Sequence, residues 1–154
     1  MEKKKRENRC AGFTLVELLI VVAIIAMVGI IAAPRVADSH RVMRFDAISD
    51  QLLNDLRFAR KSAMDLNTDI RVDFASGVDY TITAVTAGKQ LRKRSYPESG
   101  AGWKITFTGG TKLFFNSQGL PHDGSNNPLG GNITITGGSG KTRVFTVYTT
   151  GMIR

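Results

Sequence analysis

The stretch FTLVELLIVVAIIAMVGIIAAP, residues 13–34, decides the fold because it is a long apolar run. Glu17 is its only charged residue. A helix over the 21 residues 13–33 would be about 30 Å long, and the hydrocarbon core of a bilayer has a similar thickness. Five bases lie in the first twelve residues, and basic residues tend to stay in the cytoplasm. The sequence therefore predicts a membrane-spanning helix, with a cytoplasmic amino terminus and the remainder of the chain across the membrane.

Glu17 is an unusual residue for such a helix, since a carboxylate at the bilayer centre costs about 2.5–3.5 kcal/mol and usually has a partner. In one interpretation the partner is the amino-terminal end of its own helix, where the macrodipole favours an anion. In another, cleavage before Phe13 creates an α-amino cation that pairs with Glu17 of a neighbouring subunit. A plain anchor helix leaves Glu17 unexplained. A secretory signal peptide is a poor match, because its apolar core is shorter, about 7–15 residues.

Pro34 closes this stretch and interrupts helical hydrogen bonding, because proline has no backbone N–H. It marks either the exit from the membrane or a kink, which the neighbouring Gly29 would assist.

The basic leader ending in Gly12, followed by FTLVELLIVVAIIA with Glu17 four residues after Phe13, resembles the class III signal of type IV pilins and type II secretion pseudopilins. The resemblance implies cleavage between Gly12 and Phe13 by the prepilin peptidase and methylation of the new Phe13 amine. It also implies that Glu17 and Phe13 form an assembly charge pair, and that the helix is kinked near Gly29 and Pro34. The partners it implies are other pilin or pseudopilin subunits. The protein would be a single-pass inner-membrane protein with a periplasmic head, incorporated into a pilus or pseudopilus.

Beyond Pro34, apolar residues recur every three or four positions, the period of a helix with one buried stripe. They are Phe45, Ile48, Leu52, Leu56, Ala59, Ala63 and Leu66. The charged residues between them predict a solvated face: Arg44, Asp46, Asp50, Asp55, Arg57, Arg60 and Lys61. We therefore divide the chain into a cleaved leader (1–12), an assembly helix (13–34), an amphipathic continuation (35–67) and a β-rich periplasmic head (68–154).

After Asn67 the sequence changes to short alternating runs of β-branched and aromatic residues separated by glycine, which indicates strands joined as antiparallel hairpins. The expected strands are 68–75, 78–85, 90–96, 103–108, 111–116, 132–136 and 141–150. The predicted fold class is α+β, a long amino-terminal helix packed against an antiparallel β-sheet head. In the last strand, either Val144, Thr146 and Tyr148 or Phe145 and Val147 should face the helix.

The segments FFNSQGLPHDG (114–124) and KTRVFTVYTTGMIR (141–154) resemble the carboxy-terminal region of secretion protein H (GspH) and FimT-like minor pilins. The resemblance implies a structural subunit of a type II secretion pseudopilus or type IV pilus. Its alternative is a FimT-like minor pilin that binds DNA during uptake. Related chains place an arginine where Met152 stands, a departure that weakens a DNA-binding role for the tail. The candidate DNA contacts are Lys89, Arg92, Lys93, Arg94, Lys141, Arg143 and Arg154. For residues 89–94, charge protecting a sheet edge is the competing interpretation.

The sequence offers no convincing catalytic site, and we expect neither an enzyme nor a cofactor or metal. The string GGSGKT (137–142) ends like a phosphate-binding loop, but Ile135 stands where that motif needs glycine, so a hairpin turn is favoured. His40 and His122 lack metal-ligand spacing. Asp123 has the oxygen ligands for calcium, but it lies in a turn-rich loop without EF-hand spacing. Cys10 is the sole cysteine, which excludes an intrachain disulfide.

Overall fold

The protein is described from a computed structural model covering residues 13–99, 102–138 and 140–154, with the side chains of residues 30–38 excepted. The chain forms two compact units, residues 1–40 and 41–154. One helix, α1 (Leu15–Leu66), belongs to both units.

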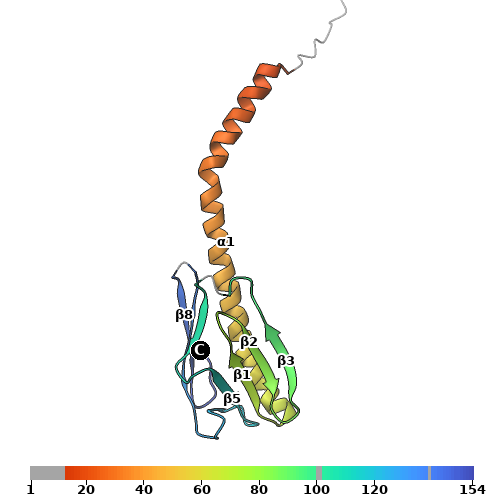
Figure 1. The fold of residues 1–154 in the computed structure, drawn as a ribbon, viewed down its shortest axis with the longest axis vertical. Coiled ribbons are helices and arrows are strands. Elements are labelled where there is room, and N and C mark those ends of the chain that lie inside the picture. Colours follow the sequence, from red (N-terminus) through yellow and green to blue (C-terminus); the bar gives the residue numbers. More distant parts are fainter. Residues whose placement is uncertain (1–12, 100–101, 139) are drawn as a thin grey trace, which may run out of the picture. The chain divides into compact units, whose positions relative to one another are not determined.

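The second unit contains two antiparallel sheets. The five-stranded sheet has the order β3-β2-β1-β5-β6, and the three-stranded sheet has the order β4-β7-β8. The strands are β1 (Ile70–Phe74), β2 (Tyr80–Ala84), β3 (Lys89–Arg94), β4 (Lys104–Phe107), β5 (Lys112–Phe115), β6 (Pro121–His122), β7 (Gly131–Thr136) and β8 (Thr142–Val147). Figure 1 shows β1, β2 and β3 beside the carboxy-terminal part of α1. The predicted α+β class is confirmed.

Side-chain and backbone caps define both ends of α1. At its start, the Thr14 hydroxyl accepts the backbone N–H of Glu17 at 3.2 Å, as expected for an N-cap residue with a glutamate three positions later. At its end, Asn67 has φ 47°, and the N–H of Thr68 reaches the Ala63 carbonyl at 3.2 Å. This left-handed turn provides the last carbonyl groups with donors and directs the chain into β1.

The apolar stripe predicted for the second half of α1 is confirmed at six of its seven positions. Phe45, Ile48, Leu52, Leu56, Ala59 and Ala63 are all buried. Leu66 is 54% exposed, so the prediction was wrong there. The physical reason is that α1 ends at Leu66, one residue before the chain turns away at Asn67.

Alternating residues of both sheets complete the core around this stripe. In the larger sheet Val72 pairs with Ile82 on one side and Leu113 on the other, and all three are buried. In β8, Phe145 and Val147 are buried and Val144 is exposed, which resolves the alternation left open by the sequence. Five of the expected strands correspond to β1, β2, β4, β5 and β8 with shorter bounds. The strand expected at 90–96 is β3, which begins one residue earlier and ends two residues earlier, and the 132–136 strand extends to Gly131.

Two ring contacts connect the layers of the head. Phe45 of α1 lies 5.9 Å from Trp103, measured between ring centroids, and Trp103 immediately precedes β4. Phe74 of β1 lies 6.0 Å from Phe107 of β4. The helix and the two sheets therefore share one core.

The described residues between β7 and β8, at 137–138 and 140–141, lie in the hairpin turn predicted for the GGSGKT segment. The Gly137 N–H donates to the Lys141 carbonyl at 2.8 Å, and Gly140 adopts φ 79°. Strand β6 was not predicted, because a two-residue strand that contains a proline carries almost no periodic signal.

We expect Leu52→Ala to lower the free energy of unfolding by about 3 kcal/mol, because it leaves a cavity beneath a fully buried side chain. Leu66→Ala is the matched control on the same helix and should change stability by less than about 0.5 kcal/mol. Urea titration followed by circular dichroism measures both. Equal losses in the two variants would contradict the assigned core.

Candidate functional site

The amino-terminal end of α1 is the first candidate site. Thr14 precedes the helix, and Glu17 lies in its first turn, so the carboxylate is close to the positive end of the helix dipole. Phe13 is 77% exposed and Glu17 is exposed as well. No ion pair involving Glu17 is recorded among the described residues. In this geometry the Glu17 carboxylate can interact with the positive end of its own helix. It is also accessible to a second chain.

An exposed apolar surface follows on the same helix. Its exposed large apolar side chains are Leu15, Val16, Leu18, Leu19, Ile20, Val21, Val22, Ile24, Ile25, Met27 and Val28, and Phe13 just before the helix is exposed as well. Within the described residues, no helix combines the length and apolar character required to cross a membrane. Gly12 and the side chain of Pro34 lie outside the described residues. The leader cleavage, the membrane span and the kink at Gly29 and Pro34 stay predictions.

A buried charge cluster in the head involves two of the candidate DNA-binding residues. Asp55 has 0% exposure, and the prediction that it lies on a solvated face was wrong. Its two carboxylate oxygens accept five hydrogen bonds from four side chains. The donors are Gln51 Nε2 at 2.9 Å, Arg92 Nη1 at 2.5 Å, Tyr80 Oη at 2.9 Å, and Arg94 through Nε at 2.8 Å and Nη2 at 3.4 Å. These donors come from α1, from β2 and from β3, so Asp55 connects the helix to the larger sheet.

The protonation of this cluster follows from its contacts. Burial acts to raise the pKa of Asp55, but hydrogen bonds from Arg94, Tyr80 and Arg92 outweigh burial and hold the pKa below its usual range. Burial is the main cause of the raised pKa of Tyr80, and the neighbouring Tyr96 and Asp55 add to it. Asp55 is therefore an anion and Tyr80 a neutral donor near neutral pH.

Two more of the candidate cations contact α1: Arg143 in β8, and Lys141 directly before that strand. Lys141 Nζ lies 2.9 Å from Asp46 Oδ1, and Arg143 Nη1 lies 2.6 Å from Asp50 Oδ1. Asp46 and Asp50 are four residues apart and so lie on one face of the helix. These pairs are partly exposed, and each contributes modestly to stability.

The seven candidate DNA contacts therefore separate into two groups. Four of them are neutralised by acids of α1, as described above. Lys89, Lys93 and Arg154 have no ion pair within the part of the chain that the structure describes. Lys89 and Lys93 belong to β3, an edge strand of the larger sheet, where charge opposes pairing with another chain. Arg154 is held by its backbone, which exchanges two hydrogen bonds with Thr146.

Several side-chain hydrogen bonds hold the loop around His122 and Asp123. His122 is buried; its Nδ1 accepts the Gly124 N–H at 3.1 Å, and its Nε2 lies 3.5 Å from Asp69 Oδ2. Asp123 Oδ1 accepts the N–H groups of Ser125 and Asn127. Hydrogen bonds from the Asn127 side chain and from backbone N–H groups lower the pKa of Asp123. The described residues contain no group of three side chains arranged to hold a metal.

The sequence analysis did not predict that Asp55, Gln51 and Tyr80 come together in one cluster. A signal was present, because Asp55 lies three residues after Leu52 and four before Ala59, inside the buried stripe. Arg92 and Arg94 are two residues apart in β3 and so lie on the same face of the strand, where both can contact one partner.

Two protein families match this chain. Residues 49–151 match the family described as type II transport protein GspH, and residues 8–33 match the prokaryotic N-terminal methylation motif. No curated protein matches.

Two solved structures have a similar fold, and both are crystal forms of the type IV minor pilin FimU from Pseudomonas aeruginosa strain PAO1. In space group P21 the TM-score is 0.59 at 18% identity, covering 72% of this chain and 87% of FimU. In space group P65 the values are 0.56 and 20%, covering 71% and 90%.

We expect Asp55→Asn to destabilise the protein by about 2 kcal/mol, because it leaves two partly buried arginines without a counter-ion. Asp50→Asn is the matched control; its pair with Arg143 is more exposed, and the loss should be below about 1 kcal/mol. Urea titration at neutral pH measures the difference. Similar losses would show that the Asp55 cluster is no stronger than a surface pair.

The cluster should also make stability depend on pH. The folded-state pKa of Asp55 is depressed, so its contribution is complete above the ordinary aspartate value of about 3.9 and is lost as the pH falls through the folded pKa. The parent protein should lose more stability than Asp55→Asn when the pH falls below about 4. Parallel pH curves for the two proteins would contradict this assignment.

Proposed function

The chain belongs to the type II transport protein GspH family and carries the prokaryotic N-terminal methylation motif, and on that premise we propose how it is processed and assembled. Membership makes it a minor pilin or pseudopilin, a subunit of a pilus or pseudopilus that assembles with other subunits. The prepilin peptidase cuts between Gly12 and Phe13, and the new amino group of Phe13 is methylated. Before assembly the protein is held in the inner membrane, with its amino terminus cytoplasmic and its head periplasmic.

The observation that carries this proposal is the position at which α1 begins. The helix starts at Leu15, so cleavage after Gly12 would place a free amine only two residues before the first turn, where Glu17 lies. The capping hydroxyl of Thr14 fixes that start without using the Glu17 carboxylate. The carboxylate is therefore free to pair with the Phe13 amine of a neighbouring subunit. Pairing removes the cost of leaving both charges in an apolar environment.

The two halves of α1 are available for different contacts. The apolar stripe of the second half is used inside the chain, against both sheets of the head. The apolar residues of 13–29 are exposed in the single chain and so remain for contacts with lipid or with other helices. Among the described residues, the ion pairs argue against DNA uptake as the function, since four of the seven candidate cations are paired with acids of α1.

We expect the protein recovered from cell membranes to begin with a methylated Phe13, and mass spectrometry of the amino-terminal peptide tests this directly. Gly12→Ala should block processing and leave residues 1–12 attached, because the glycine precedes the proposed cut. Cys10→Ala lies in the same leader and serves as the control that should be processed normally. Recovery of the parent chain with Met1 to Gly12 attached would overturn the proposal.

We expect Glu17→Ala to be processed and inserted normally while its share in the fibre fraction falls about tenfold, because the Phe13 amine loses its partner. Thr14→Ala is the control that separates assembly from helix capping, since it removes the cap and keeps the carboxylate. Quantitative immunoblots of sheared fibres and membranes measure both variants. An equal defect in both would assign Glu17 to its own helix and not to a neighbouring subunit.

A further inference from the structure

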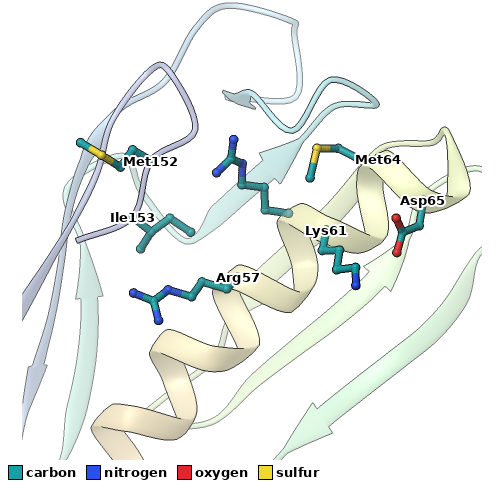
Figure 2. A pocket seen from close by; sticks show the side chains of 7 residues that line it. Arg57, Lys61, Met64, Asp65, Met152 and Ile153 are labelled. Carbon is teal, nitrogen blue, oxygen red and sulfur yellow. The ribbon is translucent and has the colours of Figure 1, made fainter.

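A pocket between the last turns of α1 and the carboxy-terminal tail has no role in the fold or function described so far. Its volume is about 590 Å³, and it is lined by Arg57, Arg60, Lys61, Met64, Asp65, Met152 and Ile153. Figure 2 shows Met152 and Ile153 of the tail on one side, with Arg57 extending from α1 toward them. Lys61 and Asp65 lie at the side away from the tail.

The pocket contains three cations from α1, which are Arg57, Arg60 and Lys61. No ion pair of Arg57, Arg60 or Lys61 is recorded among the described residues. Arg60 and Lys61 lie three and four residues after Arg57 along α1, a spacing at which like charges repel each other. An anion bound here would relieve that repulsion, and Asp65 alone leaves the pocket positively charged.

The position of Arg60 is built into the backbone. Its Nε donates to the Gly119 carbonyl at 3.2 Å. Gly119 and Gly151 have φ 75° and 83°, and a Cβ on either would lie within about 3.1 Å of Arg60 Nε. Two glycines thus allow two separate chain segments to close around one guanidinium. The structure holds this charge at the pocket instead of leaving it on a mobile side chain.

The remaining lining is apolar and adaptable. Met64 and Met152 are 43% and 50% exposed, and Ile153 is buried beside them. Methionine is flexible and polarisable, which suits contact with another protein's side chains. Among its described lining residues the pocket has no aromatic side chain on which a base could stack. The pocket is therefore better suited to a protein segment than to nucleic acid.

We propose that this pocket receives an acidic segment of a neighbouring subunit, with a carboxylate at Arg57, Arg60 and Lys61 and an apolar side chain against Met64 and Met152. The inference rests on the proposed function, since it needs other subunits beside the head. It adds the chemistry by which the head recognises one of them, independently of the Glu17 contact.

Photo-crosslinking in cells that assemble fibres tests the contact. With p-benzoylphenylalanine in place of Met152, we expect a crosslink to another subunit at a peptide that contains aspartate or glutamate, identified by mass spectrometry. Arg57→Glu in that background should lower the yield about tenfold, because it opposes the bound carboxylate. Lys93→Glu is the control of equal charge change, on an exposed cation outside the pocket, and should leave the yield within about twofold. Thermal melting verifies that both variants are folded.

A crosslink to DNA, a crosslink to a segment without acids, or equal yields for the two charge reversals would overturn the inference. So would a lack of crosslinks in protein that is present in fibres, and that result leaves the proposed function intact. If instead the parent chain is missing from fibres, the proposed function itself fails, and this inference fails with it. Immunoblots of the fibre fraction distinguish these cases.

Discussion

The buried carboxylate of Asp55 constrains how the head is built on its helix. A charge with no access to water must be compensated on all sides, and here Gln51, Tyr80, Arg92 and Arg94 supply the donors. Apolar surfaces tolerate some sliding, whereas a carboxylate with four donor side chains is satisfied in one register only. The cluster therefore fixes where the edge strand β3 lies along α1. Arg92 also covers the Phe58 ring at 3.5 Å, so the same side chain extends the packing.

The pairing of basic side chains with acids inside the head also explains why the basic composition did not predict which partners the protein binds. The chain has 21 lysines and arginines against 13 acids, which suggests a surface that attracts anions. In the folded head, however, Arg92, Arg94, Lys141 and Arg143 contact acids of α1, so most of the candidate cations stabilise the helix–sheet contact. A sequence shows how many charges a chain has, but only the fold shows which of them remain unpaired.

Periodic features were predictable, whereas contacts between distant segments were not. The three- and four-residue spacing from Phe45 to Ala63 identified the buried stripe, and alternation located the strands, since both patterns record one-sided burial. Leu66 and Asp55 broke the pattern for opposite reasons: one lies where the helix ends, and the other has buried polar partners from a different element. The pocket also escaped prediction, because Arg57 and Met152 are almost a hundred residues apart in sequence. Arg57 and Met152 come together only because the chain after β8 returns to α1.

One helix thus meets two different requirements along its length. From Phe45 onward its apolar side chains are buried by its own sheets, so its position is fixed within the subunit. Near Leu15 the apolar side chains are exposed, and hydrophobic association alone is non-directional, so it cannot set the stagger of one such helix against another. A single charge near the helix start can set it, because a carboxylate and an amine attract most strongly at one stagger. This is the physical reason to expect one acid, Glu17, among residues that otherwise carry no charge.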